Sequence, residues 1–280
     1  MTVKSLQGGL HNSVYLVSEN VVEETSSDSS FTQIAPQHWV AKRLKSPLTA
    51  QYEANAQRIA SDHDIGANVI DVEGPWIVSE WIPGVLLADE SFPIEYKVQV
   101  LVEVLSRLGS LTIETKNNFN RLSIQSVLEE LSFDVRLTDL QRKLLSSANK
   151  QATNLDTSTN EELLQLVHGD LNFSNILIEN EKFKVIDFES AALASQEYEL
   201  AMAIAVNEIP LDVLKEIFGK LCKYKGIVEF EVVMRNLFCC YLINALWYEN
   251  QYLETKQRQF STLAAKQWRL AENLHDELMK

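Results

Sequence analysis

The stretch that decides the fold is LVHGDLNFSNILIENEKFKVIDFES, residues 166–190. It holds two short apolar runs, and each run ends in a carboxylate, at Asp170 and at Asp187. Asn175 follows the first carboxylate by five residues. Short apolar runs of this kind are typical of buried strands. We therefore expect all three polar side chains to stand at the ends of hydrophobic segments.

The spacing of these polar residues fits phosphoryl transfer. His168, Asp170 and Asn175 follow the pattern H-x-D-x-x-x-x-N of the protein-kinase catalytic loop, and Asp187 stands where a protein kinase carries D-F-G. In this chemistry one carboxylate orients the attacking hydroxyl, while a carboxamide and a second carboxylate hold Mg²⁺ against the phosphates of the nucleotide. The sequence predicts a phosphotransferase that uses ATP and Mg²⁺.

Two residues upstream agree with this interpretation. A kinase-like fold needs a lysine on its third strand to bind nucleotide phosphates, and a glutamate on the next helix to position that lysine. HWVAKRL supplies Lys42, and Glu53 follows eleven residues later in a segment of helical character. We therefore expect Lys42 to bind nucleotide phosphates and Glu53 to position it.

The motifs resemble one family in particular. HGDL with its downstream Asn, followed by IDFE, is similar to the aminoglycoside phosphotransferase superfamily, which includes choline, ethanolamine and thiamine kinases. The resemblance implies an α+β, bilobal, protein-kinase-like fold with a small β-rich N-terminal lobe and a larger, mostly helical C-terminal lobe. A Pro-Gly pair at residues 83 and 84 places the boundary, so we expect a nucleotide-binding lobe over 1–82 and a catalytic and acceptor-binding lobe over 83–280.

The resemblance also implies roles for the residues of the motif. Asp170 would be the catalytic base, and Asn175 and Asp187 would be magnesium ligands. His168 would orient the catalytic loop by hydrogen bonding, and Glu189 would support the metal site or a second metal. Glu199 in YELA stands where relatives often carry aspartate, and we expect it to brace the catalytic segment.

The nucleotide site predicted from this resemblance has two further parts. QGGLHNSVYLV matches a G-G-x-x-N-x-x-Y run at Gly8, Gly9, Asn12 and Tyr15, which would bring backbone N–H groups near phosphates. An ordinary hairpin turn is the alternative for this weak motif. Backbone groups of Glu80 and Ile82 would bind the adenine edge at the hinge.

Local patterns predict the remaining elements. The first 80 residues are expected to form strands with one helix over 48–63 and a polar loop over 18–37. Beyond the boundary, apolar residues at three- and four-residue spacing predict helices. The expected helices cover residues 94–112, 123–135, 197–209, 211–225, 229–254 and 260–278.

Aromatic residues near the C-terminus are candidates for the acceptor pocket. They are Tyr241, Trp247, Tyr248, Tyr252 and Trp268. Such stripes at helical spacing often belong to the core, and the alternative is an aromatic wall that binds an organic cation. We expect a small cationic alcohol of the thiamine or choline type as the acceptor. An aminoglycoside or another small molecule is an open alternative, as is a nucleotide-binding regulatory module without catalysis.

Composition limits the partners. The chain has 280 residues and a net charge of −14, so most of its surface should repel nucleic acid. No apolar run reaches the roughly 18 residues of a membrane helix, and the N-terminus lacks the pattern of a signal peptide. Cys222, Cys239 and Cys240 do not form a disulfide or zinc pattern. We expect a cytoplasmic protein without nucleic-acid or membrane partners.

Overall fold

The computed structural model describes residues 1–6, 12–23, 33–111, 119–158, 161–210, 213 and 229–278. The chain forms two compact units. Unit 1 combines residues 1–92 with 174–191, and unit 2 combines residues 93–173 with 192–280. The division into functional lobes at residues 82 and 83 stays a proposal.

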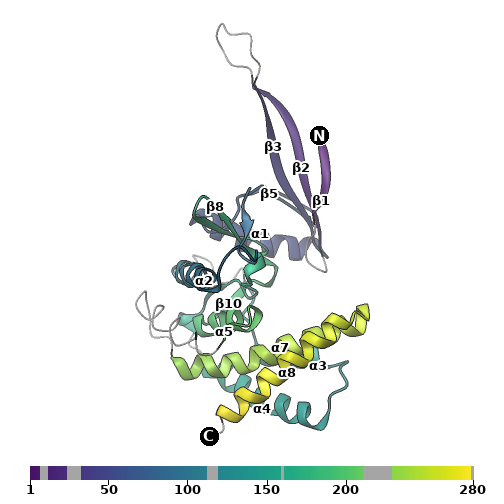
Figure 1. Ribbon diagram of the computed structural model, residues 1–280, viewed down its shortest axis with the longest axis vertical. Helices are drawn as coiled ribbons and strands as arrows, with labels where there is room; N and C mark the ends of the chain where they lie inside the picture. Colours follow the sequence, from purple (N-terminus) through teal and green to yellow (C-terminus); the bar gives the residue numbers. More distant parts are fainter. Residues whose placement is uncertain are drawn as a thin grey trace. The chain divides into compact units, whose positions relative to one another are not determined.

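Unit 1 is built on a five-stranded antiparallel sheet with the strand order β1-β2-β3-β5-β4 (Figure 1). The strands are β1 (Thr2–Leu6), β2 (Ser13–Glu23), β3 (Gln33–Arg43), β4 (Val69–Glu73) and β5 (Trp76–Glu80). The predicted loop over 18–37 is wrong at both ends, because β2 and β3 stay paired as far as Glu23 and Gln33. Pairing between strands is made by backbone groups, so a polar sequence does not prevent it.

Helix α1 (Pro47–Asp62) packs against this sheet and confirms the helix expected there. Ser46 and Thr49 form a capping box at its start, and Pro47 occupies the first turn. A core cluster joins the helix to the sheet through the buried residues Leu44, Ala50, Ala54 and Ile77. The face of α1 that carries Glu53 is thereby fixed toward β3 and β5.

A second, three-stranded sheet completes unit 1. It has the order β6-β8-β9, from β6 (Val85–Leu86), β8 (Ile176–Glu179) and β9 (Lys182–Val185). The β8–β9 hairpin is tied to the end of α1 by a hydrogen bond from the Val185 N–H to the Ile65 carbonyl (2.7 Å). Two short 3-10 helices border the hairpin, at Phe173–Asn175 and Phe188–Ser190. The hairpin thus presents its polar ends within the unit that carries α1.

Unit 2 is mostly helical. Its helices are α2 (Ile94–Leu108), α3 (Ile124–Ser132), α4 (Asp139–Ser158), α5 (Gln196–Val206), α7 (Phe230–Thr255) and α8 (Arg258–Leu278). A 3-10 turn at Glu161–Leu163 precedes the strand pair β7 (Gln165–Val167) and β10 (Ala192–Ala194). Helices α7 and α8 lie side by side, and α5 packs on α7 (Figure 1). The sheet-rich unit 1 and helical unit 2 confirm the predicted α+β fold class.

Most predicted helices are present, and one was missed. Helix α4 covers a polar stretch, but Leu144, Ala148, Ala152 and Leu155 are buried at helical spacing along it. The predicted helix over 211–225 lies outside the described residues, apart from Val213, and so does Cys222. Cys239 and Cys240 are buried in α7 as free thiols.

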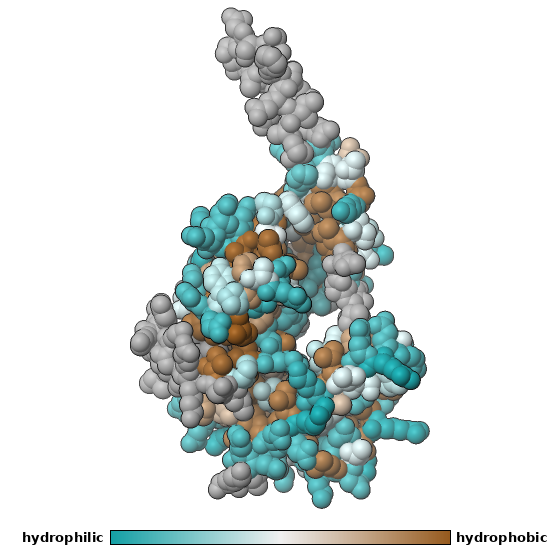
Figure 2. Space-filling model, in the orientation of Figure 1, coloured by the Kyte–Doolittle hydropathy of each residue, from teal (hydrophilic) through white to brown (hydrophobic). Residues whose placement is uncertain are grey.

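Charged and polar side chains dominate much of the visible surface. Figure 2 shows mainly hydrophilic residues over the part that contains α4 and α8, which agrees with the 39 acidic and 25 basic residues of the chain. Among the described residues, no helix is both long enough and apolar enough to cross a membrane.

Candidate active site

Lys42 is the centre of a charged cluster in unit 1. Its Nζ donates to both carboxylate oxygens of Glu53, at 2.8 and 3.0 Å, and to Oδ1 of Asp187 at 2.6 Å. Lys42 comes from β3, Glu53 from α1 and Asp187 from the turn after β9. Lys42 therefore forms ion pairs with Glu53 and with the carboxylate of the IDFE motif.

Burial and charge compete in this cluster. Burial raises the pKa of Glu53 to about 7 against the opposing effect of the Lys42 ammonium. Burial alone would lower the pKa of Lys42, but the carboxylates of Glu53 and Asp187 outweigh it, and the pKa of Lys42 is raised. The lysine therefore stays charged, and it compensates a glutamate that is only 2% exposed.

The carboxylates around Lys42 also match the donor set of a magnesium site. Oxygen atoms of Glu53, Asp187 and Glu189 lie within 4.8 Å of one another. Asp187 has a left-handed backbone (φ 68°, ψ 63°), a conformation that costs energy in a residue with a side chain. Mg²⁺ prefers such hard oxygen ligands. The residues present fit a divalent cation, which would compete with the ammonium of Lys42 for Asp187.

Asn175, the predicted amide ligand, belongs to the same unit. It ends a 3-10 turn, and its backbone carbonyl accepts the N–H of Ile186 (2.9 Å). This bond ties the residue just before β8 to the residue just before Asp187. The structure thereby brings the two predicted metal ligands to the same end of the β8–β9 hairpin.

Asn12 links the start of β2 to the IDFE motif. Its side-chain N–H donates to Oε2 of Glu189 at 2.5 Å. Gly8 and Gly9, which precede it in the predicted phosphate loop, lie outside the described residues. Asn12 thus joins the far end of that loop to a carboxylate of the charged cluster.

The predicted hinge residues lie at the end of β5. The backbone N–H of Glu80 donates to the Asn68 carbonyl (3.0 Å), and its carboxylate accepts the side-chain N–H of Asn68 (2.8 Å). Ile82 follows and is buried. The N–H of Glu80 is thus already bonded within unit 1.

The catalytic loop around Asp170 belongs to unit 2. His168 is fully buried, and its Nδ1 accepts the N–H of Asp170 (3.3 Å). The side-chain N–H of Asn172 donates to both carboxylate oxygens of Asp170, at 3.3 and 3.2 Å. Asn172 was missed by sequence reasoning, since its position in the motif accepts any residue. It fixes the orientation of the predicted base.

Glu199 braces this loop as expected. Its carboxylate accepts the backbone N–H groups of His168 and Gly169, each at 3.0 Å. Gly169 has a φ of +77°, which glycine adopts more readily than any other residue, so the turn before Asp170 requires it. Burial raises the pKa of Glu199 to about 7, while the two backbone bonds oppose that rise.

The five aromatic candidates differ in exposure. Tyr241 and Trp268 are buried in the helical core, and Tyr252 is partly exposed on α7. Trp247 and Tyr248 are also partly exposed and meet edge to face, with ring centroids 5.2 Å apart.

Phe260 of α8 contacts both rings of this pair, with centroid distances of 6.4 Å to each. We call Trp247, Tyr248 and Phe260 the aromatic cluster.

Acidic groups lie near the aromatic cluster. Burial raises the pKa of Tyr248, and the charges of Glu208 and Asp170 raise it further. Glu208 follows the end of α5 and forms an ion pair with Lys266 of α8. One ring of the cluster is therefore within electrostatic range of the predicted catalytic base.

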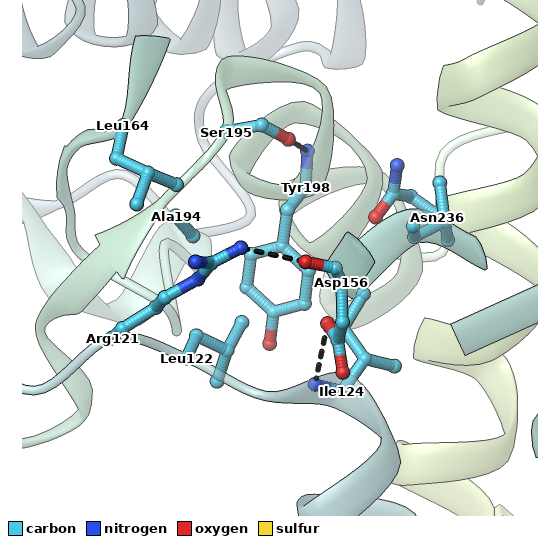
Figure 3. A pocket seen from close by; sticks show the side chains of 10 residues that line it. Arg121, Leu122, Ile124, Asp156, Leu164, Ala194, Ser195, Tyr198 and Asn236 are labelled. Atoms are coloured by element: carbon cyan, nitrogen blue, oxygen red, sulfur yellow. Dashed lines mark hydrogen bonds between the residues drawn. The ribbon is translucent and has the colours of Figure 1, made fainter. Parts of the chain in front are cut away.

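A small cavity with both polar and apolar lining residues lies in unit 2. Figure 3 shows Arg121, Asp156, Tyr198 and Asn236 around it. Its volume is about 20 Å³, enough for a single water. The Asp156 carboxylate there accepts the first N–H groups of α3, at Ile124 and Gln125 (3.2 Å each). Asp156 thus caps the N-terminus of α3, and the cavity beside it is too small to bind an acceptor.

Comparison with known proteins identifies the family. The model of the phosphotransferase enzyme family matches residues 2–220, and the chain belongs to this family. The prediction of a small-molecule kinase of the aminoglycoside phosphotransferase and choline kinase superfamily is thereby confirmed. The search of curated proteins gave no match.

Solved structures share the fold at low sequence identity. A choline/ethanolamine kinase family protein from Mesorhizobium loti has a TM-score of 0.74 at 16% identity, covering 100% of this chain and 90% of that chain. A choline kinase from Streptococcus pneumoniae reaches 0.70 at 14% identity, with 98% and 92% covered. An amicoumacin kinase in complex with AMP-PNP and Ca²⁺ reaches 0.69 at 15% identity, with 97% and 88% covered.

Proposed function

We propose that the protein transfers the γ-phosphate of ATP to a hydroxyl group of a small cationic alcohol of the choline or thiamine type. The observation that carries this proposal is the charged cluster of Lys42, Glu53 and Asp187, with ion pairs of 2.8 and 2.6 Å. A module that has lost catalysis is expected to lack the strand lysine, the catalytic aspartate or the metal aspartate, whereas this chain keeps Lys42, Asp170 and Asp187. Membership of the phosphotransferase family supports the reaction class.

The nucleotide would be held by unit 1. Lys42, oriented by Glu53, would bind phosphate oxygens. The amide of Asn12 would turn from Glu189 to the phosphates, beside the backbone N–H groups of Gly8 and Gly9. The carbonyl of Glu80 and the N–H of Ile82 would meet the adenine edge. Related structures that contain AMP or AMP-PNP are consistent with a nucleotide in this fold.

Magnesium would be held by Asn175 and Asp187, with Glu189 in support. When bound, the ion neutralises charge on the phosphates and keeps the transferred group in line. The buried position of Asn175 and the partial exposure of Asp187, whose side chain is 29% accessible, fit ligands at the edge of a site.

Asp170 would accept the proton of the acceptor hydroxyl. Its carboxylate is oriented by Asn172, and its backbone N–H is bonded to His168. Phosphoryl transfer leaves little covalent work to the protein, so a fixed base and fixed charges supply most of the rate. This role agrees with the orientation of the Asp170 carboxylate by the side-chain amide of Asn172.

The acceptor class is inferred from the surroundings of Tyr248. Trp247 and Tyr248 of the aromatic cluster are partly exposed. The charges of Glu208 and Asp170 act on Tyr248. Cations bind favourably over aromatic rings, and the carboxylates add attraction. Lys266 already places an ammonium group against Glu208. A cationic acceptor would find the same attraction there, with its hydroxyl directed to Asp170.

The test is ADP release with Mg·ATP and a panel of acceptors. The panel contains choline, ethanolamine, thiamine, an aminoglycoside, a fructosamine and 3,3-dimethylbutanol, which is an uncharged analogue of choline. We expect one small cationic alcohol to stimulate ADP release at least tenfold over the uncharged analogue. Equal stimulation by the uncharged analogue would refute the cationic acceptor. An absence of ADP release with every acceptor, with ATP bound, would favour the regulatory module.

A further inference from the structure

Helix α5 carries two side chains that bond the backbone of the catalytic loop. Near its start, Glu199 accepts the N–H groups of His168 and Gly169. Just after its end, the Asn207 side-chain oxygen accepts the N–H of Phe173 at 2.7 Å. The Asn207 amide also donates to the Leu171 carbonyl at 2.9 Å. Four backbone groups of the loop are therefore bonded to one helix.

These bonds enclose the predicted base. The groups bonded to Glu199 precede Asp170 in the chain, and those bonded to Asn207 follow it. Loop backbone groups without strand partners need other partners when they are buried. Here the partners are side chains of α5, a helix whose residues from Tyr198 to Ala205 are all buried. The loop is thus held at both sides of Asp170 by a rigid element.

The charge of Glu199 is unusual for a purely structural contact. Its side chain is 2% exposed, and among the described residues no basic side chain forms an ion pair with it. A buried carboxylate without a cation is costly, and a neutral amide would avoid that cost. A carboxylate, however, accepts two N–H groups at once, which the two adjacent residues before Asp170 present.

We propose that Asn207 is a positioning residue of the reaction, which complements the brace at Glu199 and holds the far side of the loop so that Asp170 meets the acceptor hydroxyl. This inference rests on the proposed function. A displacement of about 1 Å in a catalytic group can lower the rate by about a hundredfold. Loss of the Asn207 bonds should therefore reduce kcat by about 10- to 100-fold and leave the KM for ATP unchanged.

The chain offers a matched control for Asn207. Asn250 in α7 makes the same two kinds of bond: its amide donates to Leu246, four residues earlier, and to Leu131 in another helix. Asn207 likewise donates to Ala203, four residues earlier (2.8 Å). The two residues are both partly buried and lie in the same unit. Asn250 differs in two ways: its distant partner lies outside the catalytic loop, and Asn207 in addition accepts the backbone N–H of Phe173.

The experiment compares Asn207→Ala, Asn207→Asp and Asn250→Ala in steady-state kinetics and in amide hydrogen exchange of residues 168–173. We expect Asn207→Ala to lose 10- to 100-fold in kcat and to exchange faster in the loop, while Asn250→Ala stays within twofold in both. Asn207→Asp keeps the acceptor for Phe173 and should recover part of kcat. If Asn207→Ala does not fold, Asn207→Asp must still show the loss in kcat, smaller in size.

Equal effects of Asn207→Ala and Asn250→Ala on kcat, or no effect of either, would overturn the inference. Failure of the proposed function gives a different result, namely wild-type protein without phosphotransferase activity toward any acceptor. In that case, hydrogen exchange decides. Faster exchange of the loop in Asn207→Ala alone supports the positioning role, and unchanged exchange refutes it.

Discussion

Replacing Lys42 with methionine should destabilise the ligand-free protein more than replacing Glu53 with glutamine. The ammonium of Lys42 lies 2.8 Å from Glu53 and 2.6 Å from Asp187, so it compensates two carboxylates at once. Without it, Glu53 would be a buried carboxylate lacking its partner, and removing one member of such a pair costs about 3–5 kcal/mol. Without Glu53, by contrast, Lys42 still pairs with Asp187.

The ammonium of Lys42 opposes the rise that burial causes in the pKa of Glu53, so its removal leaves the effect of burial uncompensated. We therefore expect Lys42→Met to lose about 3 kcal/mol, at the lower end of the range for a broken buried pair, and Glu53→Gln about 1 kcal/mol. The double variant should lose about 2 kcal/mol, because it contains no unpaired buried charge.

Urea unfolding at pH 7.5, followed by tryptophan fluorescence, measures these differences. The double-mutant cycle should give a coupling of about 2 kcal/mol between the two positions. The reasoning is refuted if Lys42→Met costs no more than Glu53→Gln, or if the double variant loses the sum of the single losses.

Three further predictions concern the loop and the acceptor. Burial raises the pKa of Glu199 from 4.5 to about 7, so the folded state holds a proton that the unfolded state releases. Glu199 should therefore lower the stability by up to about 3 kcal/mol as the pH rises from 4.5 to 7. In urea unfolding, the decline of Glu199→Gln should be smaller than that of the wild type by this amount, because the raised pKa of Glu53 still contributes. An equal decline in the variant would refute this. Asn12→Ala should raise the KM for ATP about 3- to 10-fold in initial-rate measurements with little change in Tm, since its bond to Glu189 is exposed; an unchanged KM contradicts a phosphate contact. Glu208→Gln should raise the KM for a cationic acceptor about fivefold or more and leave that of 3,3-dimethylbutanol unchanged, whereas equal shifts would show a general packing effect.

The catalytic motifs could be predicted from the sequence because their functional residues stand at fixed numbers of residues from one another. Lys42 and Glu53 are eleven residues apart, on a strand and on the helix that follows it, and their ion pair is present. The class of enzyme could be predicted for the same reason.

Residues that act through tertiary contacts could not be predicted. Asn207 follows Phe173 by 34 residues, and its role depends on how α5 packs beside the loop. Asn172 occupies a position of the catalytic-loop motif that accepts any residue. Helix α4 was missed because its polar surface outweighs the four small or aliphatic residues that it buries. In each case the information lies in packing rather than in local pattern.

Residues 166–190 are contiguous in the sequence, but they are divided between the two units. Asp170 folds with unit 2, whereas Asn175 and Asp187 fold with unit 1. Sequence adjacency predicted one motif, and the packing distributes it over two compact bodies. The β8–β9 hairpin belongs to unit 1 and not to the helical unit 2. It pairs with β6 and is hydrogen-bonded to the segment that follows α1.

The most direct test of the central claim is transfer of labelled γ-phosphate from Mg·ATP to the responding acceptor by wild-type protein and by Asp170→Asn. ATP affinity is measured in parallel by fluorescence titration. The account predicts that kcat falls by a factor of about 10² to 10⁴ in the variant, the range for loss of a general base, with the Kd for ATP unchanged. Wild-type turnover in Asp170→Asn would contradict the assignment of Asp170 as the base and, with it, the proposed mechanism.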